Sequence, residues 1–126
     1  MEDNVPKITD AEWKVMEVLW DNSPISAREL VDIMKDMEGW NKNTTYTVIT
    51  RLIQKGVASR EEPSFICRPL VSRDQVCLSE TRSFLQKVYD GSVKMLVTGF
   101  LSKEKLSRED IEELKKLIES NENKVE

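Results

Sequence analysis

The sequence contains no histidine and only two cysteines among its 126 residues. The absence of histidine excludes Ser-His-Asp and Cys-His catalysis, HExxH metalloprotease chemistry and every zinc site that needs a histidine ligand. Two cysteines are too few for a cysteine-only zinc site or for a disulfide framework. We therefore expect no metal and no cofactor.

Long apolar runs are also missing. No stretch approaches the roughly 18–20 apolar residues that a membrane span needs, and no basic start precedes an apolar segment of the kind found in secretion signals. We therefore expect a cytoplasmic protein that is not inserted in a membrane. The 19 basic and 23 acidic residues give a net charge of −4, which at first argues against a nucleic-acid binder.

Glycine and proline, four of each, are scarce enough to mark the ends of elements. Capping boxes at residues 9–12 and 26–29 predict the starts of two helices, because each pair of side chains satisfies free backbone amides. Gly39 is expected to end the second helix. A third helix is predicted over residues 43–55, with Gly56 as the left-handed residue that terminates it.

The periodicity changes after the third predicted helix. Residues 57–62 and 65–70 carry β-branched and aromatic side chains and flank a turn at Pro63-Ser64, which predicts a hairpin. Three helices followed by a hairpin is the order of a winged helix-turn-helix. We therefore expect a mainly α fold with a small β-hairpin, in which residues 1–71 form a winged-helix DNA-binding domain.

Three further amphipathic helices are predicted in a helical region over residues 72–120, and residues 121–126 are expected to form a frayed tail. The apolar stripes of the last two helices are typical of a dimerisation surface, and a two-fold dimer suits a palindromic DNA site. The alternative is an intramolecular three-helix cap on the winged helix. The predicted dimerisation residues are Val93, Leu96, Val97, Phe100, Leu101, Ile111, Leu114, Leu117 and Ile118.

The stretch of 22 residues from Gly39 to Arg60 contains four basic residues and no acidic one. A helix-turn-helix places this segment against DNA. With the apolar stripe of the third helix turned to the core, the opposite face carries Asn, Thr, Gln and Arg, which are side chains that contact base edges and phosphates. The alternative is a polar face that meets only water. The predicted DNA-binding residues are Lys42, Asn43, Thr44, Tyr46, Thr47, Thr50, Arg51 and Lys55, with Arg60 and Arg68 on the hairpin.

Four segments carry a resemblance to a known family: ITDAEWKVMEVLW at 8–20, TTYTVITRLIQKG at 44–56, RPLVSRDQV at 68–76 and LSREDIEELKKLI at 106–118. They resemble the penicillinase-repressor family, the BlaI/MecI/CopY group of bacterial transcriptional repressors. The resemblance extends from Ile8 to Ser120 and implies a homodimer that represses transcription. It also implies a double-stranded operator with TACA/TGTA-type inverted repeats, and control of beta-lactam resistance or a related stress response.

In the beta-lactam branch, the resemblance implies induction by a membrane sensor-protease that cuts before a Phe in the dimerisation region. That position matches Gly99-Phe100, although the usual preceding residue is Asn. The alternative is a buried Phe beside a helix-weakening Gly. No cysteine follows Cys77, which disfavours the copper-sensing branch. We expect Cys67 and Cys77 to be small buried hydrophobic residues rather than redox sensors.

Two other classes of function compete with a repressor. The first is a protein-interaction module that docks another protein with the face of its third helix, which the overall acidity favours slightly. The second is an enzyme, which we do not expect. No carboxylate pair stands apart from surface or capping roles, and the glycines are too sparse for a phosphate-binding loop.

Overall fold

A computed structural model describes residues 5–122 of the chain. The elements in chain order are α1 (Asp10–Asn22), β1 (Ile25–Ser26), α2 (Ala27–Glu38), α3 (Lys42–Gln54), β2 (Ala58–Glu61), β3 (Ile66–Pro69), α4 (Arg73–Tyr89), α5 (Val93–Leu101) and α6 (Arg108–Glu122). None of the described helices is long and apolar enough to cross a bilayer. The chain divides after Ser83 into two compact units, which we describe separately.

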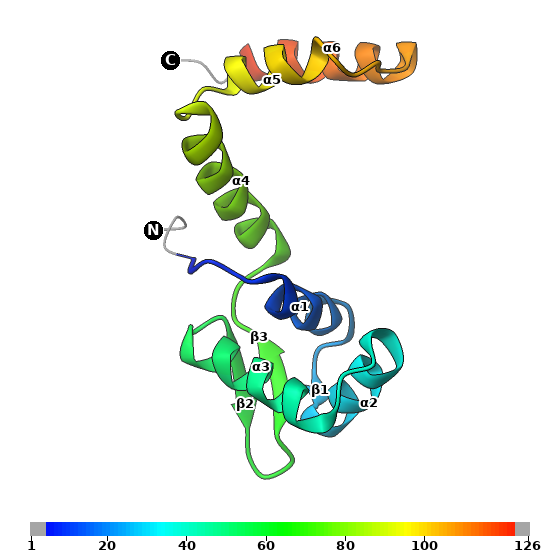
Figure 1. The fold of residues 1–126 in the computed structure, drawn as a ribbon, viewed down its shortest axis with the longest axis vertical. Helices are drawn as coiled ribbons and strands as arrows, with labels where there is room; N and C mark the ends of the chain where they lie inside the picture. The colour runs from blue at the N-terminus through cyan, green and yellow to red at the C-terminus, as the bar shows by residue number, and fades with distance from the viewer. Residues whose placement is uncertain (1–4, 123–126) are drawn as a thin grey trace. The chain divides into compact units, whose positions relative to one another are not determined.

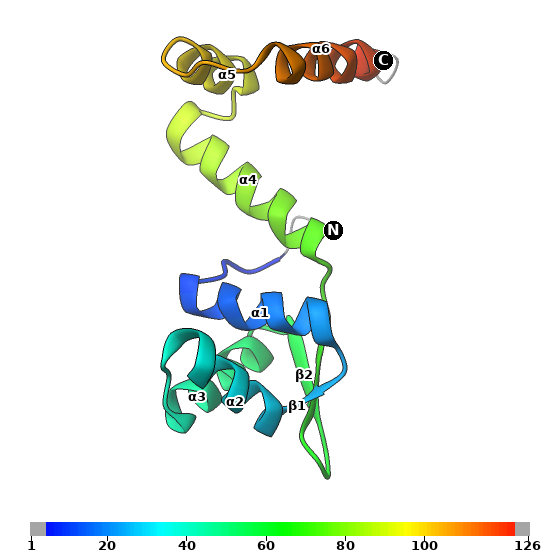
Figure 2. The same ribbon diagram turned by 90° about the vertical axis from the view of Figure 1, so that its right-hand side faces the viewer.

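The first unit packs α1, α2 and α3 beside a three-stranded antiparallel sheet of order β1-β3-β2 (Figure 1). The loop that joins β2 to β3 extends past the helices in both views (Figures 1 and 2). Three helices with a projecting hairpin confirm the expected winged-helix arrangement and the mainly α fold class.

Strand β1 is the element that the sequence did not predict. Ile25 pairs with Cys67 and Ser26 pairs with Ile66 of β3. Two residues are too few to show an alternating pattern, and Ser26 is at the same time the N-cap of α2. The hairpin strands are also shorter than predicted, because pairing is confined to Ala58–Glu61 and Ile66–Pro69.

The helix ends follow the predicted local chemistry. The hydroxyl of Thr9 accepts the amide of Glu12 at 3.2 Å, and the Glu12 carboxylate accepts the amide of Thr9 at 2.9 Å. Ser26 forms the same reciprocal box at the start of α2. Gly39 ends α2 with φ +70° and Gly56 follows α3 with φ +76°, a backbone region that glycine enters without steric cost.

The core of the first unit lies between the three helices and the sheet. The predicted inner face of α3 is confirmed, since its four stripe residues are all buried: Thr45, Val48, Ile49 and Leu52. Val76, from the first turn of α4, also reaches this core. Its largest fully buried apolar side chains are Met16, Leu19, Leu30, Met34 and Leu52, together with Val15, Val57 and Val76.

Helix α4 ends before Asp90 and Gly91, which both have positive φ angles. The prediction that Cys77 is buried was wrong, because its side chain is exposed, whereas Cys67 is buried. Neighbouring residues on a helix point about 100° apart, so the turn that sends Val76 inward directs Cys77 outward. Residues 121 and 122 of the expected frayed tail belong to α6, and residues 123–126 lie outside the described part.

Candidate DNA interface

The orientation of α3 follows from its buried stripe and its cap. Asn41 is the N-cap, and its Oδ1 accepts the amide of Thr44 at 2.8 Å. Thr45 is fully buried, as are the apolar positions one turn further along, so the opposite side of α3 is left facing outward. The Asn41 side chain already accepts the Thr44 amide. In the first turn of α3, the amides of Lys42 and Asn43 therefore remain available to bind an anion.

The outward side of α3 forms a hollow of about 430 Å³. Five of the six side chains that line it are exposed and Tyr46 is half-buried. Every member lies in the acid-free stretch, so the hollow is polar without carrying negative charge. The lining residues are Asn43, Tyr46, Thr47, Thr50, Arg51 and Gln54.

Basic side chains lie beside this hollow and on the hairpin. The ammonium of Lys42 lies over the Tyr46 ring, 5.8 Å from its centroid, and the Arg60 guanidinium lies 5.0 Å from the centroid of Phe65. Arg68 instead pairs with Glu61, with its Nε 2.7 Å from the carboxylate. Arg60 therefore carries positive charge on the hairpin, while the charge of Arg68 is balanced within it.

Lys55 lies apart from the other predicted DNA-binding residues. Its Nζ pairs with the carboxylate of Glu12 and donates to the carbonyl of Lys7 at 2.8 Å. The sequence predictions missed this pair, although a signal was present. Glu12 precedes the buried Val15 and Met16 by three and four residues, which places an acid on the inner face of α1.

Glu12 and Cys67 are two buried ionisable groups of the first unit whose pKa values are displaced from their ordinary range. Burial alone raises the pKa of Glu12, but the hydrogen bonds from Lys55 and the Thr9 amide, with the charge of Lys55, outweigh it and hold that pKa below its ordinary value. Burial raises the pKa of the Cys67 thiol, and the charge of Arg60 opposes this only in part. Cys67 is thus kept as a neutral thiol.

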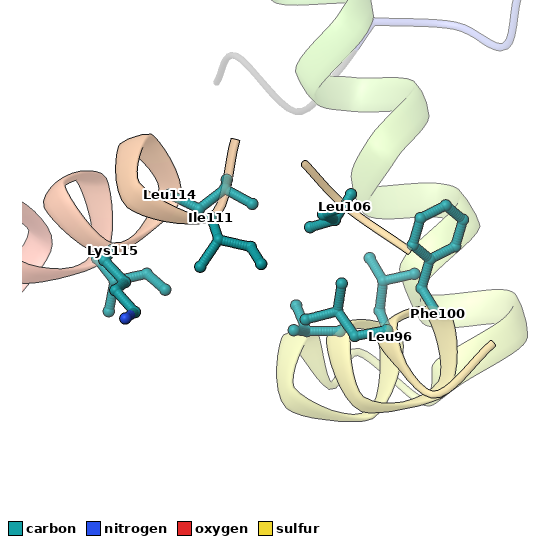
Figure 3. Close-up of a pocket in the computed structure, with 9 residues that line it drawn as sticks. Leu96, Phe100, Leu106, Ile111, Leu114 and Lys115 are labelled. Atoms are coloured by element: carbon teal, nitrogen blue, oxygen red, sulfur yellow. The ribbon is translucent and has the colours of Figure 1, made fainter. Parts of the chain in front are cut away.

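The second unit leaves most of its large apolar side chains exposed. No residue of α5 or α6 is buried in the described chain. The two helices enclose a groove of about 620 Å³, in which Leu96 and Phe100 of α5 face Ile111 and Leu114 of α6 (Figure 3). The groove brings together seven of the predicted dimerisation residues, whereas Val93 and Leu117 are exposed outside its lining. The groove is lined by Leu96, Val97, Phe100, Leu101, Leu106, Ile111, Leu114, Lys115 and Ile118.

Gly99 and Phe100 lie in the last turn of α5. Phe100 is 54% exposed in the single chain. A Cβ atom on Gly99 would lie 3.9 Å from the Tyr89 ring, an ordinary contact distance. Among residues 5–122, no three Cys, Asp or Glu side chains gather closely enough to hold a metal ion.

Comparison with known proteins identifies the family. The sequence profile of the penicillinase repressor matches residues 8–120. The chain belongs to the penicillinase repressor family. It is 32% identical over 122 residues to the penicillinase repressor of Bacillus licheniformis, covering 95% of both chains. It is also 32% identical over 120 residues to the methicillin resistance regulatory protein MecI of Staphylococcus aureus (strain N315), covering 94% of this chain and 98% of MecI.

A solved structure supports the same assignment for the first unit of this penicillinase repressor family member. The solution structure of the DNA-binding domain of the repressor BlaI matches with a TM-score of 0.53 and 30% identity, over 56% of this chain and 89% of that one. The protein is therefore a transcriptional repressor of the BlaI/MecI type with a winged-helix DNA-binding domain, and not an enzyme.

Proposed function

We propose that the protein is a homodimeric repressor that binds an inverted-repeat operator through the outward face of α3. The observation that carries this proposal is the hollow on α3, where polar side chains lie together without an acid. A recognition helix presents such side chains to base edges in the major groove. The chemistry suits a TACA/TGTA-type half-site, because Asn and Gln pair with adenine and the Thr methyl contacts thymine.

The proposed contacts divide into two kinds. Asn43, Thr47 and Thr50 are at the centre of the outward face and are assigned to base edges, with Tyr46 and Arg51 at its margins. Lys42, Thr44, Arg60 and Arg68 are assigned to phosphates, where position along the backbone matters more than sequence. Arg68 contributes least, because its pair with Glu61 must be broken or shared.

The second unit supports a homodimer. Apart from Leu96, which is half-buried, the large apolar side chains of α5 and α6 are 40–65% exposed, with Ile111 and Leu117 at the two limits. Exposed apolar surface of this density is typical of a protein interface. A second copy of the same surface would cover it by two-fold symmetry, and linking two DNA-binding units raises affinity for a two-part site.

The decisive experiment is operator binding by gel retardation at two salt concentrations. The wild-type protein should retard an inverted-repeat fragment from a target promoter and lose affinity steeply as salt rises. Thr47→Ala and Arg51→Ala should each weaken specific binding about 5- to 150-fold, in line with the loss of a base contact, while leaving the dimer intact. Arg108→Ala on α6 removes the same charge outside the first unit and is the matched control.

Two outcomes would contradict the proposal. Absence of retardation of any promoter fragment at low salt would exclude operator binding, and salt-insensitive capture of a protein by the α3 face would favour a docking module instead. Normal binding by Thr47→Ala and Arg51→Ala would refute the residue assignment alone.

We further infer that the regulated response is to beta-lactams. Two relatives, a penicillinase repressor and a methicillin resistance regulator, support this inference. A reporter gene behind the operator should be derepressed when a beta-lactam is added to cells that carry the native gene neighbourhood. Continued repression in the presence of the drug would contradict the pathway and leave the DNA-binding proposal in place.

We also propose that induction involves cleavage between Gly99 and Phe100 by a membrane sensor-protease. A cut there would separate α6 from α5 and remove one wall of the apolar groove, so the dimer would lose avidity for its operator. Mass spectrometry after induction should find a fragment that begins at Phe100. Phe100→Ala should prevent the cut and Leu101→Ala, the matched control, should not. An intact chain after derepression would contradict this mechanism.

A further inference from the structure

The ammonium of Lys55 joins three parts of the first unit. Lys55 is the C-cap of α3, and its amide donates to the carbonyl of Arg51. Its Nζ reaches the Glu12 carboxylate at the start of α1 and the carbonyl of Lys7 in the segment before α1. An ammonium has three N–H donors, and two of the three in Lys55 are committed within the protein.

The environment of Glu12 makes this pair costly to open. The Glu12 side chain is 1% exposed and the Lys55 side chain is 29% exposed. The same carboxylate also accepts the Thr9 amide as part of the α1 capping box. If Lys55 turned outward to a phosphate, a buried carboxylate would lose its cation, which is strongly unfavourable.

We propose that Glu12 and Lys55 form a positioning pair that fixes the C-terminal end of α3 against α1, so that Arg51 and Gln54, which line the hollow, are held in register with the operator. This inference rests on the proposed function, because it assumes that the face of α3 reads DNA. It assigns Lys55 an internal role in place of the DNA contact expected from its charge.

The position of Lys55 along α3 explains why this pair affects the recognition of bases. Gln54 precedes Lys55 directly and Arg51 precedes it by one turn, and both line the hollow. Base contacts depend on direction and distance, whereas attraction to phosphates is long-range and tolerates small movements. Loosening this end of α3 therefore reduces specific binding and leaves non-specific binding almost unchanged.

The test compares three variants of the full-length protein on operator and random DNA. Glu12→Gln retains the capping box, since glutamine serves at that position, and removes only the charge. Lys55→Met retains the length of the side chain. The double variant removes both charges, so no buried charge is left unpaired and stability recovers. We expect all three to bind the operator about tenfold more weakly and random DNA within about twofold of wild type, with the salt dependence unchanged.

Lys42→Met is the matched comparison for a lysine that does contact phosphate. It should weaken binding to both DNAs and reduce the slope of log K against log salt by about one. If Lys55→Met behaves like Lys42→Met, while Glu12→Gln tightens binding, Lys55 is a phosphate contact and the proposal is overturned. If the double variant binds the operator as wild type does, the pair serves stability alone and the proposal is also overturned.

A measurement without DNA separates this inference from the proposed function. Amide hydrogen exchange at the end of α3, over residues 51–57, should become about tenfold faster in Lys55→Met, because local opening no longer has to break the ion pair. Exchange at the buried turn around Leu30 of α2 is the internal control. Unchanged exchange at residues 51–57 would overturn the positioning role whether or not the wild-type protein binds its operator.

Discussion

Truncation of Ile118 to alanine should weaken the proposed dimer by a predictable amount. Ile118 lines the apolar groove and is 64% exposed in the single chain. Alanine lacks three of its carbon atoms, and each buried CH₂ group contributes about 0.8 kcal/mol. If a second copy covers the exposed 64% of this residue, the truncation reduces the free energy of dimerisation by about 1.5 kcal/mol per copy. Two-fold symmetry makes it about 3 kcal/mol per dimer, or about 100-fold in the dissociation constant.

Sedimentation equilibrium across a concentration series measures this dissociation constant directly. Leu114→Ala is a graded second variant, because Leu114 also lines the groove but is only 43% exposed; its expected loss is about 2 kcal/mol per dimer. Glu113→Ala on the same helix lies outside the groove lining and should leave the dissociation constant within about threefold. The assignment of this groove to a second copy would be refuted if Ile118→Ala dimerised with the wild-type dissociation constant. It would also be refuted if Leu114→Ala weakened the dimer more than Ile118→Ala does.

Two further predictions concern ionisable groups of the first unit. The pKa of Glu12 is lowered on folding, so its contribution to stability is present above its unfolded pKa of about 4.5 and is lost as the pH falls through the folded pKa. Urea titrations should therefore show a smaller loss of stability between pH 6 and 3 in Glu12→Gln than in wild type. Parallel curves for the two proteins would contradict this prediction. A thiol reagent should label Cys77 quickly and the buried Cys67 only after unfolding; Cys77→Ser should abolish the fast phase, and a fast phase that survives this substitution would contradict the burial of Cys67.

The helices of the first unit could be predicted because their ends depend on neighbours in the sequence. The box of Thr9 and Glu12 joins residues three apart, and glycine at positions 39 and 56 needs no partner to adopt a positive φ. Strand β1 could not be predicted in this way. The hydrogen bonds that define it come from Ile66 and Cys67, which are distant in the sequence, and two residues show no period of their own.

The face of α3 could be predicted for a related reason. Its six lining residues come from one helix, so the buried stripe alone determines which side faces outward. Lys55 departs from the prediction because its contacts with Glu12 and Lys7 join parts of the chain that no helical spacing relates. The burial predicted for Cys77 was wrong because Val76 is the only α4 residue that is buried in the core. The other apolar side chains of α4 have no core to pack against.

The net charge of −4 and a DNA-binding function are compatible because the acids are unevenly placed. The acid-free stretch ends at Arg60, and Glu61, the next residue, already neutralises Arg68 across the hairpin. Within this stretch Lys55 pairs with Glu12, so the charge available to DNA is that of Lys42, Arg51 and Arg60, and the number of phosphates that the protein can neutralise is small. Since non-specific affinity grows with that number, it should be weak. If the proposed base contacts of Thr47, Thr50 and Arg51 form, discrimination depends on them, so loss of one of them should affect the specificity ratio more than loss of a lysine.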